Sequence, residues 1–214
     1  KSAGLKVNYI EGFTSYGSML SSLESGNTDI LTTFPTSLDL GNESTIVKSK
    51  SVLKTPFVLV GKSSSNQIGS VEDLFGKKVA VVKGYVQDKY LSNFPKIEKF
   101  YVQNNNEGFE AIRSGKAKYY VNNRANTEYI LSKSFLTDLK IIHELAYKNF
   151  PPLSISFAMN GKKKELISIL NKALEQIPYK QVKMIQDKWI SNSNYISNNL
   201  NLTQPEKVWE SKHP

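Results

Sequence analysis

The chain has 214 residues, 39% hydrophobic and 22% charged, so it is long enough for one large domain or two small ones with a buried core. It has no cysteine, which excludes disulfide scaffolds, thiolate metal sites and cysteine nucleophiles, and its two histidines argue against a histidine-based metal or acid–base site. Of the residues behind the net charge of +9, only Arg113 and Arg124 are arginines, and lysines spread along the chain indicate a solvated surface rather than a nucleic-acid interface.

The first part of the chain predicts a small α/β unit. Residues 5–10 alternate as a strand, residues 16–24 have a helical pattern that ends before Gly26, and residues 29–33 form a second strand. A long extended run follows at residues 54–62.

The middle of the chain repeats a strand followed by a helix three times. Such a repeat is typical of a parallel α/β sheet with helices on its faces. The predicted strands are residues 77–83, 98–103, 118–121 and 139–145, and the predicted helices are residues 87–94, 105–113 and 124–132.

A second extended run, residues 153–160, follows the middle part and leads into two helices, residues 163–177 and 179–189. Two extended runs that bracket one α/β segment predict two lobes joined by two crossings, with a ligand cleft between the lobes. We therefore assign residues 1–60 and 154–190 to lobe 1 and residues 61–153 to lobe 2.

Several segments, in this order, resemble a known family. The match covers about residues 3–190, with motifs at 23–30 (LESGNTDI), 54–60 (KTPFVLV), 74–85 (LFGKKVAVVKGY), 108–117 (GFEAIRSGKA) and 172–177 (KALEQI), followed by Lys188-Trp189. In order and spacing these segments are similar to the type 2 periplasmic solute-binding proteins of extracellular solute-binding protein family 3. Within that family they resemble the Venus-flytrap sensor domains of BvgS-like histidine kinases.

The resemblance implies an α/β fold of the two-lobed periplasmic-binding-protein type 2 class, with two crossing hinge strands. The family's first strand and helix, about 45 residues that would precede Lys1, are missing, and a sheet without its central strand exposes an apolar edge. We expect another segment or a second copy of the chain to fill this place, so a homodimer is a possible assembly. A measurement of the solution mass tests that expectation.

The last residues resemble the opening of a further module. Residues 191–204 are rich in Asn and Ser, as linkers are, and Thr203 with Glu206 forms a helix-capping pattern. Together with Trp209 and His213-Pro214, these residues resemble the start of the next flytrap in tandem sensor kinases. We interpret residues 191–214 as a linker and the start of a following module.

Two charged anchors of the amino-acid-binding members are absent. Those members hold the ligand carboxylate with an arginine in the region that matches residues 37–42, and this chain has none there. They hold the ammonium group with an aspartate near the end of the third strand of lobe 2, where this chain has Val121-Asn122-Asn123-Arg124. Because a buried ligand charge without a partner is costly, an ordinary amino acid is a poor candidate ligand.

The residues left at the cleft are aromatic, neutral-polar or backbone. The turn at Gly84 offers N–H groups to an anion or carbonyl, and Arg124 is the candidate cation. Each of these residues also has an alternative interpretation. In it the aromatic residues pack in the core, Asn122 and Asn123 serve turns and helix caps, and Arg124 faces solvent. The predicted ligand-binding residues are Phe13, Tyr16, Phe34, Thr36, Ser37, Gly84, Tyr85, Val86, Gln87, Asn122, Asn123 and Arg124.

No catalytic residue, metal site or cofactor is predicted. His143 lies inside a predicted strand, where a structural role is more common than a catalytic one. The leading interpretation is an extracytoplasmic, periplasmic sensor domain of a membrane-bound histidine kinase that binds a small molecule and signals, by lobe closure, through an adjacent flytrap module and transmembrane domains. The alternatives are the solute-binding subunit of an ABC importer and, third, a dehydratase-like enzyme on the same fold.

Overall fold

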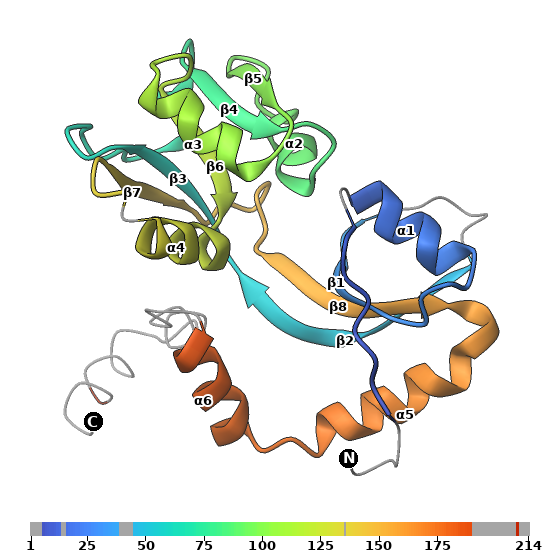
Figure 1. Ribbon diagram of the computed structural model, residues 1–214. Helices are drawn as coiled ribbons and strands as arrows, with labels where there is room; N and C mark the ends of the chain where they lie inside the picture. The colour runs from blue at the N-terminus through green and yellow to red at the C-terminus, as the bar shows by residue number, and fades with distance from the viewer. Residues whose placement is uncertain (1–5, 14–15, 39–44, 135, 190–208, 210–214) are drawn as a thin grey trace. The chain divides into compact units, whose positions relative to one another are not determined.

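The computed structural model describes residues 6–13, 16–38, 45–134, 136–189 and 209 (Figure 1). The chain divides into two units, Lys1–Pro178 and Tyr179–Pro214. The first unit holds two β-sheets, and the described part of the second consists of α6 (Tyr179–Trp189) and Trp209. The predicted linker and module start, residues 191–214, lie outside the described residues except for Trp209.

The smaller sheet has three antiparallel strands. Its order is β1 (Leu31–Pro35), β8 (Leu153–Asn160) and β2 (Ile46–Thr55). The helix α1 (Tyr16–Glu24) packs on this sheet through a small core of Leu23, Leu31, Phe34 and Ala158. Strands far apart in sequence therefore share this sheet, as the two predicted crossings require.

The helix α5 (Lys164–Glu175) follows the short helix η2 (Gly161–Lys163) and contacts β2. The backbone N–H of Lys50 donates to Asn171 Oδ1 at 2.8 Å, and the Lys50 ammonium forms an ion pair with Glu175. Both side chains of that pair are more than half exposed, so the ion pair adds little to stability.

The larger sheet has five strands in the order β5, β4, β6, β3, β7. The strands β4, β5 and β6 are parallel, which confirms the prediction for that part of the repeat. The strand β3 is antiparallel to both β6 and β7, so the sheet is mixed rather than purely parallel. The bounds are β3 (Phe57–Lys62), β4 (Lys78–Val82), β5 (Glu98–Val102), β6 (Tyr119–Asn123) and β7 (Leu139–Leu145).

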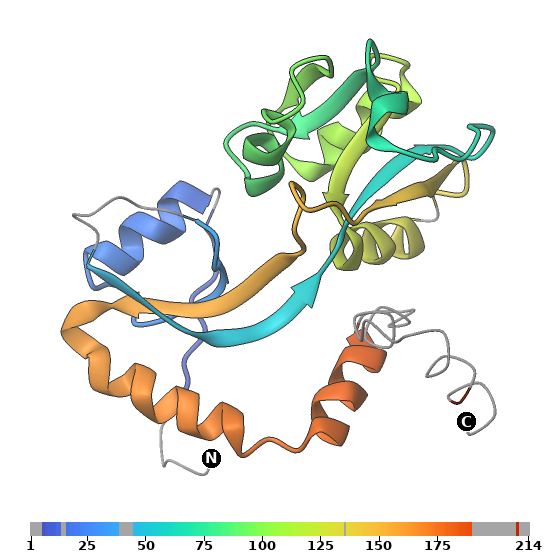
Figure 2. The ribbon, with the colours of Figure 1, turned by 180° about the vertical axis from the view of Figure 1, so that it is seen from behind.

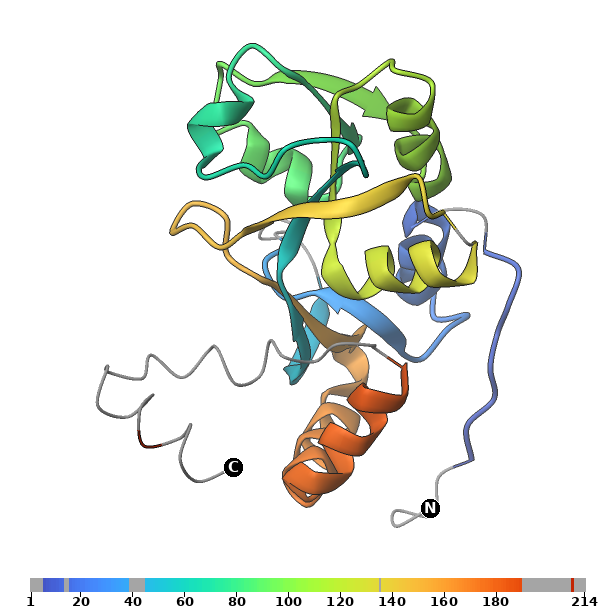
Figure 3. The same cartoon turned by 90° about the vertical axis from the view of Figure 1, so that its left-hand side faces the viewer.

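Helices cover both faces of the five-stranded sheet. Figure 3 shows η1 (Val71–Leu74) and α2 (Val86–Leu91) on one side and α3 (Asn105–Arg113) and α4 (Arg124–Lys133) on the other. Alternate residues of β3 enter the two resulting cores, Phe57 and Leu59 on one face and Val58 and Val60 on the other. Because both faces of β3 are buried, its sequence is a continuous apolar run rather than an alternating pattern.

The chain changes sheets at Pro56. The strand β2 ends at Thr55 and β3 begins at Phe57, so the predicted extended run 54–62 is two strands in two sheets (Figure 2). The change at Pro56 comes five residues before the predicted lobe boundary at residue 61. Proline has no backbone N–H, which interrupts ladder pairing at this position.

Three predicted elements differ from the structure. Residues 6–10 are not a strand, because no described segment pairs with them and Val7, Tyr9 and Ile10 remain exposed. The strand expected at residues 29–33 begins at Leu31 and reaches Pro35. The helix expected at residues 87–94 spans Val86–Leu91, and the chain then tightens before Pro95, since the N–H groups of Asn93 and Phe94 donate to the carbonyls three residues back.

The close approach of α3 to β6 leads to a stability prediction. A Cβ added at Gly108 would lie 2.5 Å from the ring of Tyr120, which is fully buried and held by a hydrogen bond to Asn105. We expect Gly108→Ala to lower the free energy of unfolding by about 1–2 kcal/mol, because overpacking outweighs the helix propensity that alanine gains. Urea denaturation measures this loss.

The control is Asn106→Ala, on the exposed side of the same helix. We expect it to leave the unfolding free energy within about 0.5 kcal/mol of the parent. Equal stability of Gly108→Ala and the parent would contradict the described packing of α3 on β6.

Candidate functional site

The candidate site lies at the carboxyl ends of β4 and β6. Parallel strands end at the same edge of a sheet, and ligands of open α/β sheets bind at that edge. The strand β4 leads into Gly84–Gln87 and β6 into Asn122–Arg124, so seven of the twelve predicted residues lie at or just after the ends of these two strands. Of these, Val86 and Gln87 belong to the first turn of α2.

Tyr85 links residues of the two sheets. Burial raises the pKa of Tyr16 to about 12, with a smaller contribution from the nearby Tyr85, and burial followed by Tyr85 also raises the pKa of Tyr120. Tyr16 begins α1 on the small sheet, Tyr120 lies in β6 of the large one, and 42% of the Tyr85 surface is exposed. Tyr16 and Tyr85 are therefore near enough to interact electrostatically, although 69 positions separate them in the sequence.

The hydroxyl group of Tyr16 is buried and has no hydrogen-bond partner among the described residues. The Tyr16 ring lies 6.4 Å from that of Phe34, at a tilt of 46°. Phe34 itself is fully buried in the core, so this predicted ligand contact is a core residue, as its alternative interpretation held. A buried hydroxyl without a partner carries a free-energy cost that a ligand or water removes.

The turn after β4 does not offer all the free N–H groups that were predicted there. Gly84 adopts a φ of +78°, and its N–H donates to Asp88 Oδ2 at 3.0 Å. The N–H of Tyr85 donates to the Val82 carbonyl at 3.3 Å. The prediction of an anion at these two N–H groups is wrong, because a carboxylate of the chain already occupies the Gly84 donor. Gln87 is buried and Val86 half-buried in the helix that follows.

Asp88 is held in its ionised form. Burial alone raises the pKa of this carboxyl, but hydrogen bonds from Lys99 and from the Gly84 N–H outweigh it and lower the pKa below the ordinary value. Lys99 Nζ donates to Asp88 Oδ1 at 2.7 Å. Sequence analysis missed this pair, because the spacing of eleven residues across a helix and a strand has no local signature.

Asn122 and Asn123 act on the local backbone, and one polar atom remains without a partner. Asn123 Oδ1 accepts the N–H of Asn126 at 2.9 Å and so caps α4. Asn122 is 1% exposed; its Oδ1 accepts the N–H of Asn123 at 2.9 Å, but its Nδ2 has no described partner. Helix capping thus explains the position of Asn123, whereas Asn122 has a buried amide donor without a described partner.

Arg124 is neither a free cation nor a solvent-facing side chain. Its Nη1 donates to Glu128 Oε1 at 3.0 Å and its Nη2 to Glu144 Oε2 at 2.9 Å, and its side chain is 24% exposed. Burial raises the pKa of Glu128, with a further contribution from the Glu144 charge, and the Arg124 guanidinium opposes this shift. Sequence analysis named the arginine but missed both carboxylates, one of which lies on the distant strand β7.

Of the remaining predicted residues, Thr36 and Ser37 follow β1 and Phe13 precedes α1. Thr36 donates through Oγ1 and its backbone N–H to the Ser154 carbonyl, at 2.9 and 2.8 Å, and so ties this segment to β8. Ser37 is exposed and Phe13 half-buried. His143 lies in β7 as predicted, and its Nε2 is 2.8 Å from the Tyr147 hydroxyl.

No protein-family model matches the chain. The sensor protein EvgS of Escherichia coli K12 is 26% identical over 153 residues, which are 71% of this chain and 12% of EvgS. The virulence sensor protein BvgS of Bordetella bronchiseptica is 24% identical over 181 residues, which are 84% of this chain and 14% of BvgS. The chain thus spans a small part of the length of either relative.

The fold has a solved counterpart. The periplasmic VFT2 domain of Bordetella pertussis BvgS matches with a TM-score of 0.72 and 23% identity, over 83% of this chain and 74% of that one. The likeness shows the Venus flytrap fold of type 2 periplasmic binding proteins and confirms the predicted fold class. None of the helices among the described residues is long and apolar enough for a membrane span.

The ion-pair cluster around Arg124 leads to a second prediction. Arg124→Met removes the guanidinium and leaves two carboxylates close together, so we expect a loss of about 2 kcal/mol of unfolding free energy at neutral pH. Since the folded-state pKa of Glu128 is raised, its proton binds more tightly in the folded protein, and the loss shrinks as the pH falls through that value. Urea denaturation at pH 7 and at about pH 4 measures both effects.

Arg113 provides a matched control. It also pairs with two carboxylates, Glu110 and Asp138, but its side chain is 43% exposed. We expect Arg113→Met to lower the unfolding free energy much less than Arg124→Met does at either pH, because solvent screens the exposed ion pairs. A loss for Arg124→Met that is no larger than the control, or that does not change with pH, argues against the described cluster.

Proposed function

We propose that this chain, which has the Venus flytrap fold and is homologous to the sensor domains of EvgS and BvgS, is the extracytoplasmic ligand-sensing domain of a membrane-bound histidine kinase. The observation that carries the proposal is the similarity to two sensor proteins over 71% and 84% of the chain. The solved relative is a periplasmic domain, which supports a periplasmic location. The adjacent module and the kinase lie outside this chain.

The proposed mechanism is a ligand-dependent change in the angle between the parts that carry the two sheets. The sheets are joined at Pro56 and through the segment between Leu145 and Leu153, both short connections suited to a hinge. Tyr16 on one side and Tyr85 on the other are the residues that a ligand would contact together. A ligand shifts the equilibrium only by its different affinity for the open and closed states.

The proposed ligand is a small polar molecule of low net charge. Arg124, the cation predicted for the site, already balances Glu128 and Glu144, and the turn at Gly84 already binds Asp88. The buried site atoms without a partner among the described residues are the neutral Tyr16 hydroxyl and Asn122 Nδ2, together with Arg124 Nε and Glu128 Oε2, whose charges are already paired with each other. A ligand with hydrogen-bond acceptors and a flat face to lie against Tyr85 satisfies the two neutral groups without burying an uncompensated charge.

A thermal-shift screen of neutral amides, small cyclic compounds, carboxylates and amino acids tests the ligand class. For any compound that stabilises the chain, we expect Tyr85→Ala to weaken binding by about tenfold, because the ring supplies a large part of the contact area. Tyr129→Ala is the control, since Tyr129 is 50% exposed on α4 and contacts Lys133. Equal weakening by both changes contradicts the site.

A crosslink between the two sheets tests the sensor mechanism in the full-length protein that carries this chain. The chain has no cysteine, so Tyr16→Cys with Tyr85→Cys introduces the single pair of thiols within it. We expect a short thiol-specific crosslinker to change kinase autophosphorylation in the double variant and not in either single variant. Unchanged output after complete crosslinking contradicts signalling by lobe closure.

A further inference from the structure

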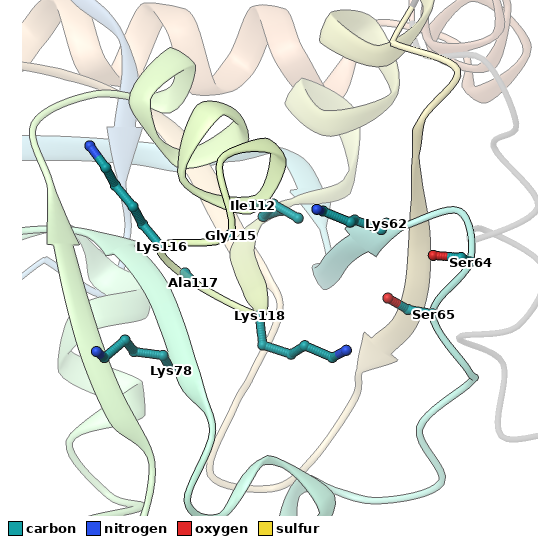
Figure 4. A pocket seen from close by; sticks show the side chains of 9 residues that line it. All are labelled: Lys62, Ser64, Ser65, Lys78, Ile112, Gly115, Lys116, Ala117 and Lys118. Atoms are coloured by element: carbon teal, nitrogen blue, oxygen red, sulfur yellow. The ribbon is translucent and has the colours of Figure 1, made fainter.

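A pocket of about 440 Å³ lies in the five-stranded sheet's domain, away from the candidate site. Four lysines and two serines line it, and no acidic residue does (Figure 4). Lys78 is the first residue of β4 and Lys118 precedes β6, whereas the candidate site follows the carboxyl ends of these strands. At about 3.3 Å per residue, a five-residue strand puts about 15 Å between the two ends.

Three of the lysines form one row across neighbouring strands. Val79 pairs with Tyr119 and the Lys118 N–H donates to the Lys78 carbonyl at 2.8 Å, so Lys78 and Lys118 are neighbours. Val60 pairs with Tyr120 in the antiparallel ladder, which places Lys62 opposite Lys118 two residues further on. Because side chains alternate along a strand, the three lysines share the face that carries α3.

The wall of the pocket comes from the end of α3 and the turn after it. Ile112, Gly115, Lys116 and Ala117 form this wall. In Figure 4 the Lys118 side chain extends toward Ser65, and Lys62 lies between Ile112 and the loop of Ser64 and Ser65. The Lys62 and Lys118 ammonium groups and the hydroxyls of Ser64 and Ser65 therefore border one space, whereas the Lys78 and Lys116 ammonium groups extend to the other side in this view.

The positive charge of this row is largely uncompensated within the described residues. Among them, Lys78 has an ion pair, with Glu98 at 3.3 Å, whereas Lys62, Lys116 and Lys118 have none. The nearby carboxylates Glu110 and Asp138 are bound to Arg113. Like charges on neighbouring strands destabilise a sheet, so the row carries a cost that a bound anion would remove.

We propose that this pocket binds a small oxyanion with two or more negative charges, of the di- or triphosphate type. Lysine binds phosphate as a point charge, and several lysines around one concave site reinforce one another against a multivalent anion. A single-charged carboxylate gains too little from such a site to displace water and counterions. The site is separate from the proposed ligand site and does not depend on the sensor function.

Isothermal titration of the chain with inorganic tripolyphosphate, at about 0.15 M salt, tests the proposal. We expect saturable binding that Lys62→Gln with Lys118→Gln weakens by about tenfold or more. The control, Lys89→Gln with Lys148→Gln, removes the same charge from exposed positions outside the pocket and should leave binding within about twofold.

A second arm distinguishes a free anion from a membrane headgroup. It measures binding to vesicles that contain cardiolipin, whose headgroup carries two phosphates, and to neutral vesicles of phosphatidylcholine. Binding of either tripolyphosphate or anionic vesicles that is lost in the pocket variant supports the site and identifies the source. No binding of either, or equal weakening by the pocket and control variants, overturns the proposal.

Discussion

The change of sheets at Pro56 is the constraint on which the rest of the structure depends. It puts β2 and β3 into different sheets and places the start of α4 against the crossing. The Arg124 N–H donates to the Pro56 carbonyl at 2.8 Å, and the Ala125 N–H donates to Thr55 Oγ1 at 3.2 Å. A movement of the chain at Pro56 therefore displaces the amino end of α4, which is part of the candidate site.

Charge has two separate roles in this chain. At the candidate site the charged groups pair with one another, Arg124 with two glutamates and Asp88 with Lys99. At the opposite edge of the same sheet, four lysines gather around one pocket, and among the described residues Lys78 pairs with Glu98 whereas the other three have no ion pair. The composition alone had indicated lysines spread evenly over the surface. In the structure, four of them instead gather around this one pocket.

Patterns within one segment predicted the elements well. The helices at residues 105–113 and 16–24 have the expected bounds, because apolar spacing, the Asn104 cap and the glycine stops act locally. Residues 6–10 have the alternation of a strand but find no partner among the described residues, and alternation alone does not supply one. Of the site residues, Tyr85 and Tyr16 are near enough to interact electrostatically, whereas Phe34 lies in the core, since the aromatic type suits both places.

The sequence by itself determined the two-sheet α/β organisation and the residues at the strand ends, since these follow from hydrophobic period and turn chemistry along the chain. Only the tertiary structure decided which charges remain available. Glu144 comes to Arg124 from β7, Lys99 to Asp88 from β5, and Lys62, Lys78 and Lys118 meet across three strands. Such pairings depend on strand order and register, which long-range packing of apolar faces sets and which no local pattern encodes.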